Sequence, residues 1–469
     1  MEFKQNSKLF LSKIIIVLLL SMSVFGNELN EILNQFDNNQ TYNSPDKAPQ
    51  ENKENDARLV IDGEIQLYTS YSYSHPSNME PDYAKLSHIK SRLDLNADIN
   101  FNQNWKGKLE GYAFYDAIYN IKGQDQYPQD VLDDYEKEAE LENVYIKGAL
   151  TTNLDLKIGR QLVRWGKSDN LVVTDILNPY DLREPGTFDL DEFKLPVTMT
   201  KFDYYFNAWN LSLIAINEVR FDKEPPIGSE YNPLSLYSVP IHTVNISDNK
   251  PSSNLENTQW AASVQHSSHN FDFSLYYADV FDKKGTLENN GTLQREYDRI
   301  FMFGGDISLV VDKWILFAET AYFSDMKYNN ISGSNIEISE SDRLDILGGI
   351  EYHGFEDVLI TFEALDRHLL DYKQGMLDAY FQEIKKNQIE YAFRLDADFL
   401  HQTLHFHYFT KYFGKKGEEG GVHRGWIKYD VTDSFDITLG IINYIGGDNN
   451  YIEAIKDNDR VYTVLKYRF

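Results

Sequence analysis

The amino-acid sequence predicts an all-β protein, a single transmembrane antiparallel β-barrel of about 18 strands. Three observations predict it: apolar and polar residues alternate over long segments, short and long connections alternate, and aromatic residues mark segment ends. Alternation puts apolar side chains on one face of a strand and polar side chains on the other. The mean hydropathy of -0.49 is that of a polar chain, but it does not exclude a barrel. Apolar and polar residues that alternate along a strand average to a polar value.

Two segments precede the alternation. Residues 1–26 contain three lysines, the apolar run Ile14–Leu20 and then small residues, which is the three-part pattern of a secretory signal peptide. The run is shorter than the about 20 apolar residues of a spanning helix, and an uncleaved anchor is the alternative. Residues 27–58 are rich in Asn, Gln, Asp and Glu and predict a polar periplasmic N-terminal segment. A short helix there that docks on a partner or plugs the lumen is the alternative.

The alternation starts at Leu59, so residues 59–469 form the predicted barrel. In its first segment Ile61 and Ile65 share one face, and Asp62 and Glu64 share the other. A soluble sandwich would also alternate, but many segments here have the about 9–11 residues that cross a membrane. The same pattern recurs in 271–281, 300–311, 343–353, 389–399, 435–445 and 461–469.

The connections give the strand count. Short turns are predicted near 102–103, 151–152, 207–208, 267–268, 312–313, 354–355, 401–402 and 433–434. Long polar links are predicted at 75–85, 122–138, 166–194, 219–254, 282–296, 325–341, 367–388, 414–420 and 446–458. Each long link joins two strands, which gives about 18, and short periplasmic turns with long extracellular loops are typical of outer-membrane barrels.

Aromatic residues support the same fold. An aromatic girdle at the membrane boundary is predicted at the strand ends, marked by Trp105, Trp260, Phe271, Trp314 and Phe435. The last segment ends on Phe469, which shares a face with apolar residues and resembles the insertion signal of bacterial outer-membrane barrels. We therefore expect the barrel-insertion machinery to recognise Phe469.

The composition excludes several classes of function. The formal net charge of -28 argues against nucleic acid, and the absence of cysteine excludes disulfide scaffolds and cysteine nucleophiles. No G-x-S-x-G elbow, H-E-x-x-H or phosphate loop is present, so we expect no enzyme, no catalytic residue and no cofactor. His401, His405 and His407 cluster near one turn without a third acidic ligand, and we expect no metal site.

Charged residues fall on the predicted inner face. Facing lipid, each would cost about 2–4 kcal/mol near the midplane, so the lumen must be wet or salt-bridged. These side chains either pair across strands and stiffen the wall or line a pore that filters solutes. A basic stripe is predicted at His88, Lys90, Arg92, Lys106 and Lys108. The other inward positions are Asp94, Asp98, Glu110, Asp116, Lys157, Asp272, Asp306, Glu319, Arg343, Asp345, Glu351, Glu363, Arg394, Asp396 and Asp398.

One segment, residues 158–184, has a distinctive pattern. It leaves a strand and enters a long link, with a bulge predicted at Gly159 and a turn at Asn178-Pro179. If the link enters the bore, its arginines could hold anionic groups or pair with wall carboxylates. The alternative is that the motif only pins the link to the wall. The candidate constriction residues are Arg160, Arg164, Trp165, Asn178, Asp181, Arg183, Lys90 and Arg92.

This pattern, GRQ-x-x-x-WG followed by NP-x-D, resembles a poorly characterised family of porin-like outer-membrane barrels, a domain of unknown function. The family is loosely similar to alginate-export-type porins. The resemblance implies movement of small organic or lipid-like compounds across the outer membrane, with an inner-membrane efflux system as a partner. The motif match is confined to residues 158–184.

Two other links have local patterns. In 373–388 an apolar stripe at helical spacing predicts a helix packed on the barrel rim, with Met376, Leu377, Tyr380, Phe381 and Ile384. The acidic run Asp125 to Glu142 predicts a solvated loop, with divalent-cation bridging to lipopolysaccharide as the alternative.

We therefore expect an integral protein of the outer membrane of a Gram-negative bacterium, in contact with lipid and lipopolysaccharide, that acts as a channel. A non-channel surface, structural or receptor barrel and an outer-membrane hydrolase are the alternatives. The solute, the direction of transport, the ion selectivity and the oligomeric state are left open, as is plugging of the lumen by 166–194 or 27–58.

Overall fold

The computed structural model describes residues 58–75, 81–187, 193–233, 246–289, 292–332, 335–378 and 382–469. The predicted signal peptide, residues 1–26, and the predicted N-terminal segment up to residue 57 lie outside these residues. A search of the described residues for a helix of membrane-spanning length and apolarity finds none.

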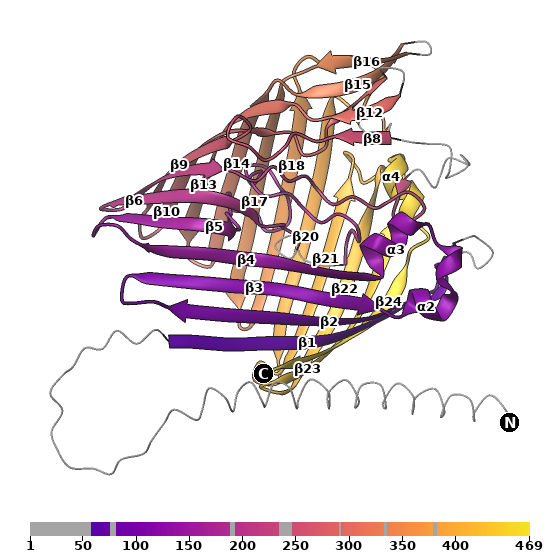
Figure 1. The fold of residues 1–469 in the computed structure, drawn as a ribbon, viewed down its shortest axis with the longest axis horizontal. Helices are drawn as coiled ribbons and strands as arrows, with labels where there is room; N and C mark the ends of the chain where they lie inside the picture. The colour runs from indigo at the N-terminus through magenta and orange to yellow at the C-terminus, as the bar shows by residue number, and fades with distance from the viewer. Residues whose placement is uncertain are drawn as a thin grey trace. The chain divides into compact units, whose positions relative to one another are not determined.

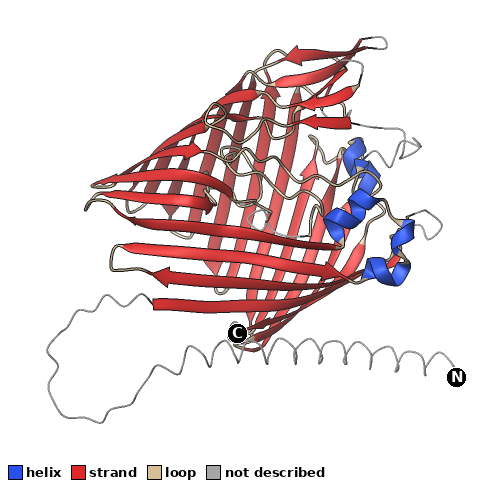
Figure 2. Ribbon diagram, in the orientation of Figure 1, coloured by secondary structure: helices blue, strands red, loops and turns tan. Residues whose placement is uncertain are grey.

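Within the described residues, eighteen strands form one antiparallel sheet that closes on itself (Figures 1 and 2). Strands pair with their neighbours along the chain, and β24 pairs with β1 from Glu64–Arg468 to Ser72–Arg460. Closure leaves no sheet edge in a bilayer, and the predicted barrel is confirmed. Its strands are Arg58–Ser72 (β1), Lys85–Asn100 (β2), Trp105–Asp116 (β3), Lys137–Ala149 (β4), Leu154–Gln161 (β5), Val197–Phe206 (β6), Trp209–Ile216 (β7), Gln259–Ser267 (β9), Phe271–Phe281 (β10), Arg299–Val311 (β13), Trp314–Ser324 (β14), Arg343–Phe355 (β17), Val358–Leu369 (β18), Asn387–Phe399 (β20), Leu404–Phe413 (β21), Gly420–Thr432 (β22), Phe435–Ile445 (β23) and Arg460–Arg468 (β24).

Short turns lie at one end of the barrel and long links at the other, as predicted. A two-residue hairpin turn needs residues in the left-handed backbone conformation, which Asn and Asp tolerate. Asn207 and Asp312 have φ of 53° and 54° in the β6–β7 and β13–β14 turns. One predicted turn is displaced: β17 continues to Phe355, so the turn falls at 356–357 instead of 354–355.

The two faces of the wall differ as the alternation predicted. Apolar side chains such as Ile61, Leu275 and Phe303 are more than half exposed on the outer face. Charged side chains such as Glu319 and Glu363 face inward and are almost fully buried. The chain ends on the outer face at Phe469, whose backbone N–H donates to the Gly63 carbonyl at 3.0 Å.

Helices and small sheets cover the long-link end. Two α-helices and a 3-10 helix follow β3, and their aromatic side chains pack together with Tyr83 and Val131. Two three-stranded sheets stand above the β9–β18 side (Figure 1). These elements are Ile118–Lys122 (α2), Gln124–Gln126 (η1), Gln129–Tyr135 (α3), Asn450–Ile455 (α4), Ile246–Asn249 (β8), Thr286–Asn289 (β11), Leu293–Glu296 (β12), Lys327–Ser332 (β15), Asn335–Glu340 (β16) and Met376–Leu377 (β19).

Three local predictions are wrong. The 373–388 stripe does not form a helix in its described part: Met376–Leu377 is β19, which pairs with β15, and residues 379–381 lie outside the described residues. The run from Asp125 to Glu142 is not one solvated loop, because β4 begins at Lys137 and turns its glutamates inward. Gly159 is not a bulge, because β5 pairs in register through it with both β4 and β6.

Candidate channel lumen

The described residues of the link between β5 and β6, 162–187 and 193–196, run into the barrel; we call them the first lumen link. Leu171, Val173 and Leu177 are buried in one apolar cluster with inward-facing wall residues, among them Met199 on β6 and Met302 on β13. Burying each such side chain contributes roughly 1.5–3 kcal/mol. The link therefore fills part of the lumen with an apolar core of its own.

Two wall carboxylates hold the tip of this link. Glu319 on β14 accepts hydrogen bonds from the backbone N–H groups of Lys167 and Ser168, at 2.5 and 2.7 Å. Glu363 on β18 accepts from Ser168 Oγ at 2.6 Å and from Asn170 Nδ2 at 2.9 Å. Along the closed wall, β18 is eight strands from β5, so the link crosses to the far side.

The base of the first lumen link is closed by Asn178. Its Oδ1 accepts from Val163 N–H at 2.9 Å, and its Nδ2 donates to the Leu195 carbonyl at 3.0 Å. Trp165 is 4% exposed and stacks on Tyr276 of β10 with 4.6 Å between ring centroids. Both side chains fix the link rather than face open space.

The link between β7 and β9 also reaches across in its first described part, residues 217–233; we call this part the second lumen link. Its Glu230 pairs with Arg460 of β24, with 2.6 Å between Oε2 and Nη2, and lies 3.7 Å from His88 Nε2 of β2. Nearby, Glu184 of the first lumen link pairs with Lys90 of β2 at 2.6 Å. Burial opposes ionisation, but these cations outweigh it and lower the pKa of both glutamates to about 2.

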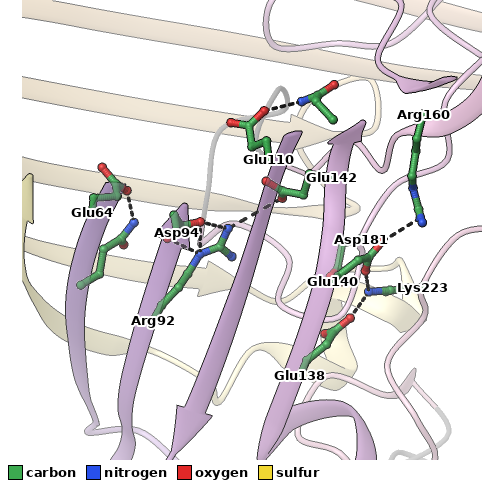
Figure 3. Close-up of polar contacts among 12 residues, drawn as sticks. Glu64, Arg92, Asp94, Glu110, Glu138, Glu140, Glu142, Arg160, Asp181 and Lys223 are labelled. Carbon is green, nitrogen blue, oxygen red and sulfur yellow. Dashed lines mark hydrogen bonds and ion pairs between the residues drawn. The ribbon is translucent and has the colours of Figure 1, made fainter. Parts of the chain in front are cut away.

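The two links meet on the inner face of β4 (Figure 3). Glu140 Oε1 lies 2.9 Å from Arg160 Nη2, and Glu140 Oε2 lies 2.6 Å from Lys223 Nζ of the second lumen link. Glu138 Oε2 lies 2.7 Å from Arg183 Nη2 of the first. Further ion pairs join Arg220 to Glu140 and Lys223 to Glu138. Carboxylates of β4 thus tie both links to the wall.

The neighbouring wall of β2–β4 carries ionised groups that remain partly exposed. Arg92 stacks over the Tyr112 ring at 3.9 Å and donates from Nε to Asp94 at 2.8 Å, with Glu142 3.7 Å away. The side chains of Arg92, Asp94 and Glu142 are 32%, 21% and 31% exposed, whereas Glu319 is buried. Figure 3 shows this group beside Glu110, which accepts from Asn143 at 2.7 Å. This group is one part of the inner wall that the links leave accessible.

Comparison with known proteins places the chain in a family. Residues 41–469 match the family described as "Protein of unknown function (DUF1302)". The chain belongs to this family. The comparison with curated proteins finds no match to this chain.

Comparison with solved structures identifies proteins of similar fold to the DUF1302 chain. It resembles Pseudomonas aeruginosa OpdK with vanillate (TM-score 0.50, 12% identity) and OccK8 (TM-score 0.50, 11% identity), each over 88% of this chain and 98% of the other. It also resembles Acinetobacter baumannii OccAB3 (TM-score 0.51, 11% identity) over 88% of this chain and 99% of the other. The fold is that of outer-membrane porins. The match over residues 41–469 confirms the predicted family of unknown function, while the GRQ-x-x-x-WG and NP-x-D motif as its signature and the alginate-export similarity stay predictions.

The eight predicted constriction residues of the DUF1302 chain fall into two groups. Arg92, Arg160 and Arg164 have side chains that are 32%, 23% and 48% exposed, and Arg164 pairs with Asp169. The other five make contacts that join the links to the wall or to themselves: Lys90, Trp165, Asn178, Asp181 and Arg183.

Sequence reasoning missed the groups that receive the links. Glu319 and Glu363 were predicted to face inward, but nothing in their local sequence indicates the residues 167–170 that they bind. The pairing of Glu230 with Arg460 joins positions 230 residues apart.

His405 and His407 bond to Asp398 and Asp396, and no cluster suited to a metal ion occurs among the described residues.

Proposed function

We propose that this protein is an outer-membrane channel for small organic or lipid-like solutes. The observation that carries the proposal is the wall of β2–β4, where Arg92, Asp94 and Glu142 stay partly exposed although other residues of the same wall hold the lumen links. A barrel of about 18 strands is wide enough for water unless loops fill it. Charged side chains that stay accessible inside such a wall provide a hydrated path.

The arrangement of the links supports the same proposal. The apolar core of the first lumen link lies against the inner faces of β6 to β20, which places its bulk on one side of the lumen. Because the links are tied by carboxylates to fixed positions, the path beside them has a defined lining. Small solutes would pass Arg92, Arg160 and Glu142, whose charges select among them.

Planar-bilayer recording tests the proposal. The refolded full chain should give discrete, long-lived conductance steps in potassium chloride. A matched control keeps the barrel and changes only an outer loop charge, for example Lys250→Gln, and should conduct like the wild type. A correctly inserted barrel without conductance steps would reject the channel.

One observation favours a second function, a non-channel surface or receptor barrel. Both lumen links cross the barrel and are pinned to the opposite wall by buried ion pairs such as Glu230–Arg460. If they close the path, the refolded barrel will insert without conducting. In both cases we expect the protein in the outer membrane, exported by residues 1–26 and recognised through Phe469. An inner-membrane efflux system is the proposed partner of the channel.

A further inference from the structure

Four lysines stand in direct cross-strand register near the short-turn end of the barrel. Lys106 of β3 is opposite Lys147 of β4, Lys147 is opposite Lys157 of β5, and Lys157 is opposite Lys201 of β6. Residues opposite one another share a face, and neighbouring strands are about 4.8 Å apart. We call this set the lysine row.

The lysine row faces the lumen. Its sequence neighbours Ile146, Ile158 and Phe202 are exposed apolar residues of the outer face, and alternate residues point to opposite faces. Lys106 and Lys147 are exposed, and Lys157 and Lys201 are half-buried. The four ammonium groups are therefore accessible from inside the barrel.

Three members of the row form no ion pair with a carboxylate of the described residues. Lys201 pairs with Asp203 at 2.8 Å, while Lys157 lies over the Tyr145 ring at 3.9 Å. Across the described part of the chain, no carboxylate comes within 4.0 Å of the ammonium nitrogen of Lys106, Lys147 or Lys157.

Other lumen lysines are paired. Lys428 lies 3.2 Å from Asp430, and Lys466 lies 3.0 Å from Glu64. Like charges directly opposite each other destabilise a sheet. A row of three unpaired lysines is therefore a local positive site inside an acidic protein, and an anion bound there would offset the repulsion.

We propose that the lysine row binds a solute group with at least two negative charges, such as a phosphate or two closely spaced carboxylates. Each ammonium is a compact charge with three donors, and several on adjacent strands can contact one such group together. The binding site stands on its own geometry, while its role in selecting solutes rests on the proposed channel function.

The test uses inorganic pyrophosphate as the probe and the refolded full chain in detergent. Titration calorimetry measures binding, and bilayer recording measures block of the chloride current. The double variant Lys147→Gln/Lys157→Gln should weaken both binding and block by about a hundredfold, since each of the two lost charge-assisted contacts is worth roughly a factor of ten. Lys428→Gln removes the same kind of charge from the lumen but leaves the lysine row intact. Its pyrophosphate affinity and its block should stay within about twofold of the wild-type values.

The outcomes separate the two proposals. Binding that depends on the row in a barrel that does not conduct supports the site and rejects the channel. Conductance with no pyrophosphate binding, or with equal binding in the wild type and the double variant, overturns the lysine row as a site and leaves the channel standing. Equal weakening in Lys428→Gln also overturns it, because the effect is then one of general charge.

Discussion

Arg460 at the start of the last strand and Glu230 in the second lumen link form a buried ion pair, with 2.6 Å between Nη2 and Oε2. Arg460 has no exposed side-chain surface and Glu230 has 5%. A buried pair is costly to break, because removing one partner leaves the other charge uncompensated. The closing seam of the barrel and the position of the link therefore depend on each other.

Replacing Glu230 should destabilise the barrel strongly. We expect Glu230→Ala to lower the free energy of unfolding by about 3–5 kcal/mol, since the Arg460 guanidinium stays buried without its partner. Urea titration of the refolded protein measures this value. Glu453→Ala breaks an exposed pair with Lys456 and should change it by about 1 kcal/mol or less. Equal midpoints for the two variants would show that the pair does not hold the link.

The barrel should lose stability in acid. The pKa of Glu184 and Glu230 is lowered from 4.5 to about 2 because Lys90, His88 and Arg460 outweigh the burial that opposes ionisation. A lowered pKa stabilises the folded state fully above pH 4.5, and this contribution is lost as the pH falls from about 4.5 to about 2. Each carboxylate should contribute on the order of 3 kcal/mol at neutral pH.

Unfolding midpoints in urea between pH 7 and pH 2 measure this dependence. Glu184→Gln removes one of the two titrating groups, so its stability should fall less steeply over the same interval. A variant that loses stability in parallel with the wild type over that interval would contradict the assignment.

The fold could be predicted because its signals are local. Alternation within each strand and the Asn207 and Asp312 turns need only a few neighbouring residues. Gly159 shows the limit: the sequence suggests an irregularity there, but the position requires glycine for two other reasons. Its φ is +127°, and a Cβ would lie 2.2 Å from the Val144 carbonyl oxygen of the neighbouring strand β4. The strands pair without a shift.

The lumen could be predicted only in part. The alternation in the sequence predicts that Glu319 and Glu363 face inward. Their partners in residues 167–170, however, depend on where a long link crosses the barrel. The Glu230–Arg460 pair joins residues 230 apart, and no pattern along the chain connects them. The 373–388 stripe was misassigned because apolar spacing alone does not distinguish a helix from a strand that packs on the same core.

Releasing the tip of the first lumen link should widen the path. Glu319→Ala removes the acceptor of the Lys167 and Ser168 amides, and each unmade buried hydrogen bond costs about 1–3 kcal/mol. We expect larger single-channel conductance with more current noise in bilayer recordings. Glu351→Ala removes an inward carboxylate whose side chain, among the described residues, pairs with His353 alone, at 3.3 Å, and should leave the conductance unchanged. Matching conductance in both variants would show that Glu319 does not position the link.

Arg92 should set ion selectivity without supporting stability. Its side chain is 32% exposed beside Asp94 and Glu142, so Arg92→Gln leaves two carboxylates on the accessible wall without their cation. The reversal potential in a potassium chloride gradient should shift toward that of potassium, and the shift should shrink at high salt because screening weakens exposed charges. The free energy of unfolding should change by about 1 kcal/mol or less. Lys250→Gln removes one positive charge from an exposed loop pair with Asp248, and its reversal potential should match the wild type. An equal shift in both variants would mean that net charge, rather than the Arg92 wall, determines which ions pass.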